Sequence, residues 1–327
     1  MEIVNMICLF LICAVFCGFI MGYVYRWHGV PFVGKWKTPF ICMRGEISIG
    51  ISTVSKIEEL QQNSRLVLSR LDVNDVNAEF VADPFLFHGK EQWYMFMEVF
   101  NKSRNRGEIG LAISEDGLKW AYQSIVLREP FHLSYPYVFE HQKEIWMIPE
   151  SASDNSVRLY RAIDFPETWK LEKKLLEGNP YTDPSIFQHK ELWWMFVSCN
   201  MSRDLLLYFA NDLMGPWERH PRSPIVYSQP QNARCAGRVV TINGKLIRFA
   251  QDCEQEYGKS VSAFCVECLD KKNYKETQLG TSPILFPSGQ SWKSKNMHHI
   301  DLHLLSDGSY LASVDGGRER RSFGLKY

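Results

Sequence analysis

A repeat of about 50 residues constrains the fold of this chain more than any other feature. Each copy opens with a residue–proline step that leads into an apolar strand, with prolines at Pro84, Pro136 and Pro184. A second pattern runs in phase and places a tryptophan at 120, 169 and 217, each after an apolar strand and a turn. Repeats of this length indicate solenoids, propellers or arrays.

One repeat unit reads as strand, turn, strand, loop, strand, turn, strand. This order describes a four-stranded blade, and blades arranged radially form a propeller. We predict blades at about 81–130, 131–177 and 178–226, a fourth beginning near 236 and a fifth at 298. The alternating segment 46–53 is expected to complete the last blade and close the ring, whereas residues 54–80 carry no strong signal. The predicted fold class is all-β, a five-bladed β-propeller over 46–327 preceded by an N-terminal transmembrane helix.

The transmembrane helix is predicted from an uncharged apolar run over 4–24. About 20 such residues are long enough to cross a bilayer. No Lys or Arg precedes the run, and no small-residue cleavage site follows it, so an uncleaved anchor is favoured over a signal peptide. We therefore expect an anchor at 1–27 and a linker at 28–45.

The orientation of this anchor rests on two opposing signals. Basic residues at 26, 35 and 37 would keep the body of the chain in the cytosol. Two glycosylation sequons, at 101–103 and 200–202, favour a lumenal body. We expect a type II single-pass glycoprotein with its propeller in the ER/Golgi lumen or outside the bacterial inner membrane.

Charge and cysteine usage narrow the range of partners. The chain has 37 basic and 37 acidic side chains and no long basic run, which argues against a nucleic-acid partner.

Cys265 and Cys268 have a spacing found in metal sites, but residues three apart on a regular strand point to opposite faces. We predict that both are small buried residues. The His and Asp of blade five could hold a metal, but no ligand spacing there is diagnostic, and we assign no metal site.

The geometry of a blade places the candidate site. The first strand of each blade lines the central channel, and its start lies at the same rim as the end of the second strand. Acidic residues fall at these points in several blades, and basic residues fall at the same level. They are Asp83, Asp183 and Asp301 on first strands, Glu98, Glu150 and Asp252 on second strands, and Arg234, Arg238, His298 and His299.

Carboxylates that converge on one mouth shift one another's pKa values and favour proton sharing. Glycosidic bond chemistry uses such a pair, one acid and one base or nucleophile. We predict Asp83 as base or nucleophile and either Glu150 or Asp183 as acid. Arg238 and His299 are expected to hold an anionic group such as a phosphate. The predicted substrate-binding residues are Glu98, Tyr135, Arg234, Arg238, Asp252, His298, His299 and Asp301.

Structural roles are the alternatives for these residues. An Asp–Pro step can cap a turn, although blade two has Tyr135 at this place, so the turn itself does not demand Asp. Glu98 and Glu150 could be solvated rim charges. Arg238 could be the partner in a structural ion pair, and His298 with His299 could form an ordinary hairpin edge.

Several of these segments resemble a known family. They are Ala-Asp-Pro-Phe at 82–85, Ser-Tyr-Pro-Tyr-Val-Phe-Glu at 134–140, Met-Ile-Pro-Glu at 147–150, Thr-Asp-Pro-Ser-Ile-Phe at 182–187, Ala-Arg-Cys-Ala-Gly-Arg at 233–238, Ala-Gln-Asp-Cys at 250–253 and Tyr-Gly at 257–258. Together they resemble the N-terminal propeller-like region of plant glucosamine inositolphosphorylceramide transferases, over about 46–317. Similar regions appear in bacterial proteins. Plant members carry a further family 64 glycosyltransferase domain downstream, which the resemblance does not reach.

More distantly, the layout is similar to the five-bladed glycoside hydrolases of families 43, 32 and 68. Their blade-one Asp, a base or nucleophile, corresponds to Asp83. Their blade-two Asp would fall at Tyr135 and Pro136 and is absent, and their general-acid Glu matches Asp183 only loosely.

The resemblance implies a carbohydrate-active enzyme that transfers a sugar onto a membrane-borne or surface glycan or glycolipid. No cofactor is expected, although a nucleotide-sugar donor would be a substrate. A glycoside hydrolase using the same carboxylates and a non-catalytic glycan-binding module are the alternatives.

Overall fold

The computed structural model describes residues 15, 41–199, 203–289 and 291–323. The chain divides into two compact units, one comprising 46–318 and the other its two ends, 1–45 and 319–327. The predicted anchor at 1–27, apart from residue 15, and the predicted linker as far as residue 40 lie outside the described residues. In the part that is described, no helix has the length and apolar character needed to span a bilayer.

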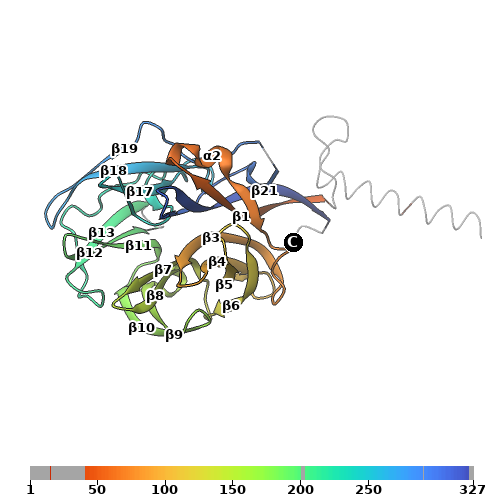
Figure 1. The fold of residues 1–327 in the computed structure, drawn as a ribbon, viewed down its shortest axis with the longest axis horizontal. Coiled ribbons are helices and arrows are strands. Elements are labelled where there is room, and N and C mark those ends of the chain that lie inside the picture. Colours follow the sequence, from red (N-terminus) through yellow and green to blue (C-terminus); the bar gives the residue numbers. More distant parts are fainter. Residues whose placement is uncertain (1–14, 16–40, 200–202, 290, 324–327) are drawn as a thin grey trace, which may run out of the picture. The chain divides into compact units, whose positions relative to one another are not determined.

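The unit 46–318 is a five-bladed β-propeller, as the repeat predicted. Within the described residues, five sheets follow one another around a ring (Figure 1). Blade one contains β3 (Ala78–His88), β4 (Trp93–Asn101), β5 (Arg106–Ser114) and β6 (Ala121–Leu127). Blade two contains β7 (Ser134–His141), β8 (Glu144–Ser151), β9 (Ser156–Asp164) and β10 (Thr168–Glu177).

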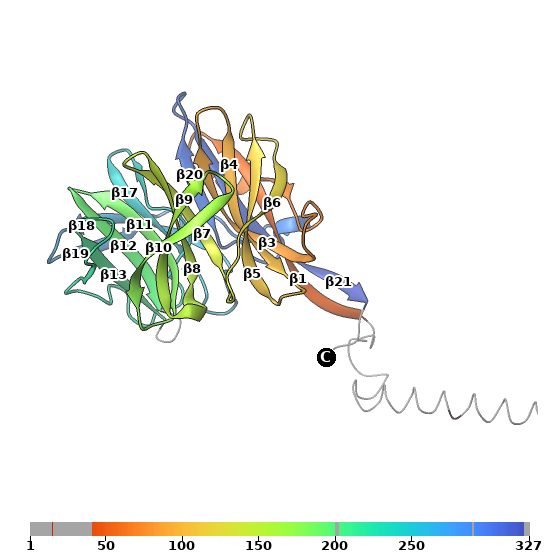
Figure 2. The ribbon, with the colours of Figure 1, turned by 90° about the horizontal axis from the view of Figure 1, so that it is seen from below.

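Blades three and four continue the ring. Blade three contains β11 (Tyr181–His189), β12 (Leu192–Cys199), β13 (Asp204–Ala210) and the short β14 (Glu218–Arg219). Blade four contains β15 (Arg234–Cys235), β16 (Val240–Ile242), β17 (Lys245–Gln251), β18 (Val261–Leu269) and β19 (Tyr274–Gln278). Seen from the side, the sheets have the twist that is usual for β-structure (Figure 2).

Blade five joins strands from both ends of the chain. Its order is β2-β1-β21-β20, with β20 (Ile300–Leu304), β21 (Tyr310–Phe323), β1 (Ile41–Val54) and β2 (Arg65–Leu68). The segment 46–53 therefore completes the last blade as predicted. The prediction missed β2, which has only four residues and is the outermost strand of the blade, with its first two residues exposed.

Short helical turns accompany the strands, and one of them ties down the closing blade. They are η1 (Ile57–Glu59), α2 (Leu60–Asn63), η2 (Ala152–Asp154) and η3 (Ser291–Lys293). The buried Lys293 Nζ donates to the carbonyl of Gln61 at 2.7 Å and to Ser64 Oγ at 2.6 Å. These bonds join the loop before β20 to the connection between β1 and β2.

The repeated tryptophans have a structural role. The indole N–H of Trp120 donates to the carbonyl of Gly117 at 3.0 Å, and Trp169 and Trp217 make the same kind of bond to Pro166 and Leu213 at 2.9 and 3.1 Å. A half-buried indole needs such a partner. The bond holds the turn between the third and fourth strands, which explains why the residue recurs with the blade period.

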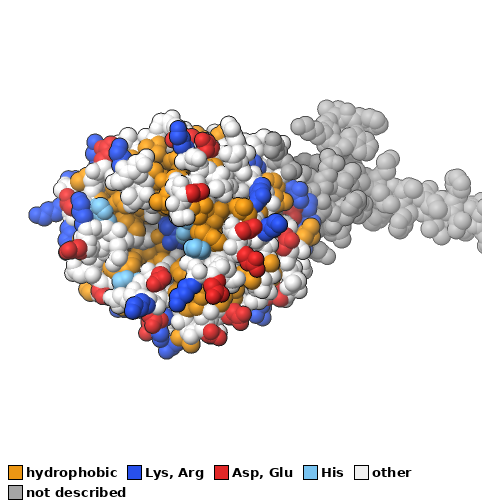
Figure 3. Space-filling model, in the orientation of Figure 1, with side chains coloured by type: hydrophobic (Ala, Val, Ile, Leu, Met, Phe, Trp, Pro, Cys, Tyr) orange, Lys and Arg blue, Asp and Glu red, His pale blue; other side chains and the backbone are white. Residues whose placement is uncertain are grey.

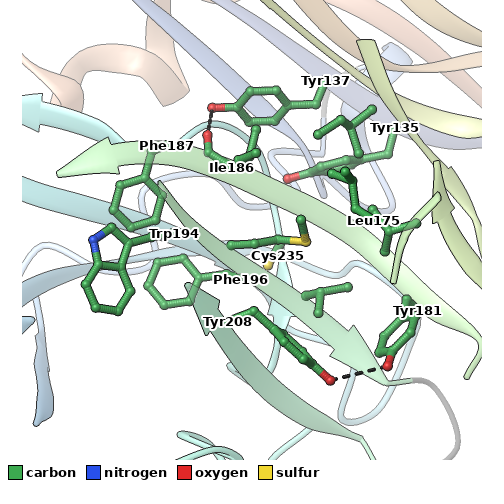
Figure 4. Packing of buried hydrophobic residues seen from close by; sticks show 14 of the residues in the cluster. Tyr135, Tyr137, Leu175, Tyr181, Ile186, Phe187, Trp194, Phe196, Tyr208 and Cys235 are labelled. Carbon is green, nitrogen blue, oxygen red and sulfur yellow. Dashed lines mark hydrogen bonds between the residues drawn. The ribbon is translucent and has the colours of Figure 1, made fainter. Parts of the chain in front are cut away.

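Apolar side chains fill the space between neighbouring blades. Figure 4 shows this packing, where the Tyr137 hydroxyl of blade two donates to the carbonyl of Ile186 in blade three. Within blade three, the hydroxyls of Tyr181 and Tyr208 lie 3.2 Å apart. Burial of apolar area stabilises a fold by about 25 cal/mol per Å². These contacts therefore hold the inner strands in place around the channel.

The first sequon lies in a position that does not suit glycosylation. Asn101, at the end of β4, is only 4% exposed. Its Nδ2, the atom that a glycan would occupy, donates to Glu108 Oε2 at 3.0 Å. Asn200, in the second sequon, lies outside the described residues.

Candidate active site at the mouth of the propeller channel

The first strands of blades one to three begin with the same backbone irregularity. Asp83, Tyr135 and Asp183 have φ angles of 51°, 48° and 51°, and each lies at a shift in strand register. A positive φ is uncommon for residues other than glycine, and bulges of this kind re-aim a side chain. Because Tyr135 adopts the conformation as well, the turn does not explain why blades one and three carry Asp.

Asp83 is a buried carboxylate held by two histidines. Its Oδ1 lies 3.4 Å from Nε2 of His298 and 3.8 Å from Nδ1 of His299. Burial alone would raise the pKa of Asp83, but the hydrogen bond and charge of His298, with the charges of His299 and Arg234, lower this pKa to about 2. Asp83 is therefore ionised at neutral pH.

Two glutamates at the ends of the second strands have pKa values shifted in the opposite direction. Glu98 and Glu150 are only 6% and 8% exposed. Burial, reinforced by the charge of Asp83, raises the pKa of Glu98 well above its usual value. Burial and the charge of Asp183 raise the pKa of Glu150 in the same direction, although Arg234 opposes the shift. Neither side chain is a solvated rim charge.

A histidine that the sequence prediction did not include faces Glu98. His132 Nε2 lies 3.5 Å from Glu98 Oε1, and His132 Nδ1 accepts the backbone N–H of Gly107 at 2.8 Å. Burial lowers the pKa of His132. A neutral ring that accepts at Nδ1 carries its proton on Nε2, toward Glu98.

Arg234 links blades two, three and four. Its Nε lies 2.5 Å from Asp183 Oδ2, and its Nη2 lies 3.5 Å from Glu150 Oε2. Gln251 Nε2 also donates to Asp183 Oδ2, at 3.1 Å. The guanidinium carbon of Arg234 lies 4.9 Å from the centroid of the Tyr257 ring. Asp183 is thus held as an acceptor by two fixed donors.

Seven of the predicted residues therefore belong to one network. They are Asp83, Glu98, Glu150, Asp183, Arg234, His298 and His299. On the face shown in Figure 3, hydrophobic side chains surround the centre of the molecule, where basic and histidine side chains are also visible.

Arg238 has a different place from the one predicted. Its Nε lies 2.8 Å from Asp301 Oδ1, and its Nη2 donates to the carbonyls of Leu86 and Val138 at 3.3 and 3.0 Å. Asp301 also accepts the N–H of Leu86 at 2.7 Å and faces His303 Nε2 at 3.1 Å. Arg238 and Asp301 thus form the structural ion pair that was the alternative for Arg238, and both are committed to protein partners rather than to a ligand.

Tyr135 and His299 are also committed to the protein. The Tyr135 hydroxyl accepts the N–H of Gly237 at 2.6 Å and lies 2.8 Å from Ser185 Oγ, so it bridges blades three and four. His299 is fully buried, and its Nε2 lies 3.2 Å from the carbonyl of Pro84. A fully buried ring offers no surface to a phosphate, contrary to the expectation for His299.

Asp252 lies one residue away from the position assigned to it. The register of β17 places Gln251 opposite Arg234, as Glu98 lies opposite Ala82 in blade one. Asp252 instead accepts the N–H of Glu254 at 3.0 Å in the following turn. Because alternate strand residues point to opposite faces, a shift of one residue removes Asp252 from this position and brings Gln251 into it.

Four residues of the network were missing from the sequence prediction: Asp315, His132, Gln251 and Tyr257. Asp315 lies near the point of β21 that corresponds to Glu98 in β4, so the blade repeat carried a signal for it. Gln251 would have followed from the correct register. His132 and Tyr257 lie in connections outside the strands, where the repeat gives no information.

One set of residues has the spacing of a metal site. The ligand atoms of Asp83, His298 and Asp315 lie within 4.8 Å of one another. However, both ring nitrogens of His298 face a carboxylate, and a metal would have to replace a proton on one of them. The positive charge of a protonated ring already balances this site, so we assign no metal to it.

The argument from strand geometry failed for the two cysteines of β18. A register shift between Val266 and Cys268 interrupts the alternation. Cys265 and Cys268, together with the residues between them, border a pocket of about 610 Å³. Both are partly exposed.

A smaller pocket adjoins the network. It has a volume of about 280 Å³, and its lining includes Arg234 and Tyr257 of the network together with Ser198, Asp204 and Cys253. The pocket is large enough for a single sugar ring and lies beside the Arg234–Glu150 contact.

The fold and site define a five-bladed β-propeller with a cluster of buried carboxyl groups whose pKa values are shifted in opposite directions. Solved structures with this fold include a thermostable family-43 glycoside hydrolase, with a TM-score of 0.55 and 14% identity, covering 78% of this chain and 97% of that one. The GH32 β-fructofuranosidase BmSUC1 of Bombyx mori matches with a TM-score of 0.54 and 16% identity, over 79% and 67% of the two chains. At these identities the likeness shows the fold alone.

The chain belongs to the family described as glucosamine inositolphosphorylceramide transferase 1, N-terminal, whose model matches residues 62–317. Glucosamine inositolphosphorylceramide transferase 1 of Oryza sativa subsp. japonica is 38% identical over 250 residues, which are 74% of this chain and 34% of the relative. The protein of the same name from Arabidopsis thaliana is 35% identical, over 74% and 32% of the two chains. The chain thus spans about a third of the length of the relatives it matches.

Proposed function

We propose that this protein is a carbohydrate-active enzyme that transfers a sugar onto a glycolipid. The names of its relatives supply the substrate class, glucosamine and inositolphosphorylceramide. One observation carries the chemical part of the proposal: the pKa of the buried Asp83 is lowered, whereas the pKa values of Glu98 and Glu150 in the same network are raised. Environments that push carboxyl pKa values apart are typical of acid–base pairs.

The roles follow from these protonation states. Asp83 acts as the base or nucleophile, because it is charged at neutral pH. Glu150 acts as the acid, because its raised pKa favours the protonated form and it contacts Arg234, which lines the pocket. Asp183, which we had considered as an acid, accepts hydrogen bonds from Arg234 and Gln251 and serves to hold Arg234. Glu98 is the second protonated group and contacts the substrate.

The proposed donor is a nucleotide sugar, and no cofactor is required. The sugar ring would occupy the pocket beside Arg234 and Tyr257, where an aromatic ring and fixed polar groups suit a sugar's mixed surface. We further propose a type II anchor at 1–27 that holds the propeller against a lumenal or outer membrane surface, where a glycolipid is within reach. Glycosylation of the chain would then fall on Asn200 rather than on the buried Asn101.

The test is a transfer assay on the full chain. The protein is incubated with vesicles that contain inositolphosphorylceramide and with UDP-N-acetylglucosamine or UDP-glucose, and glycosylated lipid is measured by mass spectrometry. Transfer is expected with the wild type and is expected to fall at least 100-fold in Asp83→Asn and Glu150→Gln. The matched control is Glu254→Gln, which replaces an exposed carboxyl group in the loop that follows β17. Wild-type levels of transfer in Asp83→Asn would refute the assigned roles.

Hydrolysis is the second candidate, because an ionised and a protonated carboxyl group also suit the attack of water. Release of free sugar from glycosylated lipid in the absence of a nucleotide-sugar donor would establish it. Binding of glycolipid vesicles without either product, unchanged in Asp83→Asn and Glu150→Gln, would instead indicate a glycan-binding module.

A further inference from the structure

Asp315, on β21, is a fully buried carboxylate that joins three segments of the chain. Its Oδ1 accepts the backbone N–H groups of His298 and His299 at 3.1 and 3.0 Å. Its Oδ2 accepts the backbone N–H of Asp83 at 3.2 Å. Both carboxylate oxygens of Asp315 therefore accept hydrogen bonds, one from Asp83, the proposed base, and the other from the two histidines beside it.

The same carboxylate also faces the ring of His298. His298 Nδ1 lies 3.0 Å from Asp315 Oδ1, and His298 Nε2 lies 3.4 Å from Asp83 Oδ1. The two contacts are close approaches of charged groups, and Nδ1 does not meet hydrogen-bond geometry in this arrangement. Because a carboxylate lies beside each ring nitrogen, the charged, doubly protonated form of His298 is favoured between Asp315 and Asp83.

The other groups around His298 agree with a charged ring. The Tyr257 ring lies 5.3 Å away, and the charge of His298 opposes the upward shift in the pKa of Glu98, on β4. The neighbouring cation is Arg234, which is paired with Asp183. Burial lowers the pKa of His298, but the carboxylates of Asp315 and Asp83 outweigh this effect and hold the pKa well above its usual value.

We propose that Asp315 is a positioning residue for Asp83: it holds the Asp83 backbone through the N–H group and fixes His298 as the partner that aims the Asp83 carboxylate into the channel. This inference rests on the proposed function, in which Asp83 is the base or nucleophile. Asp315 has no exposed surface and so acts only through its neighbours.

The backbone of Asp83 gives this role a physical reason. Its φ of 51° is a strained conformation for a residue other than glycine and persists where surrounding contacts support it. The hydrogen bond from the Asp83 N–H to Asp315 is such a contact. Without it, the residue can relax and move the carboxylate away from its aimed position.

The test compares the full-length wild type with Asp315→Asn, using ¹⁵N-labelled histidine and NMR of the ring nitrogens at pH 7. In the wild type we expect both nitrogens of His298 to carry protons. In Asp315→Asn we expect the ring to lose one of them. His298→Gln assigns the signal, and Glu254→Gln is the control that leaves it unchanged. A neutral His298 in the wild type, or an unchanged ring in Asp315→Asn, would overturn the proposal.

Asp83→Asn provides an independent readout should Asp315→Asn fail to fold. With only Asp315 left as a carboxylate partner, His298 is expected to keep the proton on Nδ1 and lose the one on Nε2. The reverse tautomer would contradict a role for Asp315. These spectra need no substrate, so they decide the role of Asp315 even if the transfer assay shows no activity. Where transfer is detected, Asp315→Asn should lower kcat roughly 10- to 100-fold with little change in KM, because it changes the orientation of the Asp83 carboxylate rather than the binding of substrate.

Discussion

Arg238→Ala tests whether the inner part of the channel is held together by an ion pair rather than reserved for a ligand. Asp301 is 0% exposed and the Arg238 side chain 16% exposed. The substitution removes the 2.8 Å contact to Asp301 and the donors for the carbonyls of Leu86 and Val138. Asp301 would keep only the N–H of Leu86 and the ring of His303.

The size of the effect follows from burial. Removing one partner of a buried ion pair leaves an uncompensated charge and costs about 3–5 kcal/mol. At about 2–3 °C per kcal/mol for a domain of this size, the melting temperature should fall by roughly 6–15 °C. Arg238→Lys keeps the charge but not the forked geometry. Its melting temperature should therefore lie between those of the wild type and Arg238→Ala.

The assay is thermal unfolding followed by calorimetry or tryptophan fluorescence. Arg161→Ala is the matched control, because Arg161 is 33% exposed and pairs with the exposed Glu144 and Glu172. Surface pairs of this kind contribute about 0.2–1 kcal/mol, so the control should melt within about 3 °C of the wild type. If Arg238→Ala also melts within that range but binds glycolipid vesicles more weakly, the guanidinium serves a ligand and our reasoning is wrong.

Three further results are expected. Because the pKa of Glu150 is raised in the folded state, its contribution to stability is present below about pH 4.5 and is lost as pH rises through the folded pKa. Glu150→Gln should therefore gain stability over the wild type by about 1.4 kcal/mol for each pH unit between about pH 4.5 and the folded pKa, with no further gain above it, measured by urea unfolding at several pH values, and parallel curves would contradict the raised pKa. Peptides from protein made in a secretory cell should show Asn101 unmodified by mass spectrometry, because its amide is buried against Glu108, and a glycan there in most molecules would contradict the fold at β4. Tyr135→Phe should lower stability by about 1–3 kcal/mol in urea unfolding, because the N–H of Gly237 loses its acceptor, and an unchanged midpoint would show that water replaces the hydroxyl.

Much of the fold could be predicted because the blade repeat is a local property. The prolines at 84, 136 and 184 and the tryptophans at 120, 169 and 217 mark equivalent points of successive sheets, and the alternation over 46–53 predicted a strand that closes the ring. β2 escaped prediction because an outermost strand faces water and lacks the apolar alternation that marks an inner one.

The candidate site could be predicted in part for the same reason. The phase of the repeat indicates which residues lie at the channel mouth, and so it pointed to Asp83, Glu98 and Glu150. An error of one residue in that phase was enough to select Asp252 in place of Gln251.

The sequence by itself determined the number of sheets, the strand that closes the ring and the acidic character of the channel mouth, because each depends on spacing along the chain. The tertiary structure alone decided the partners: that Arg238 meets Asp301, that Arg234 meets Asp183, and that Asp315 lies behind His298. These partners belong to different blades or to strands that pair only in the folded ring. Which charges neutralise one another, and which carboxyl groups keep their protons, therefore depends on distances and burial that spacing does not contain.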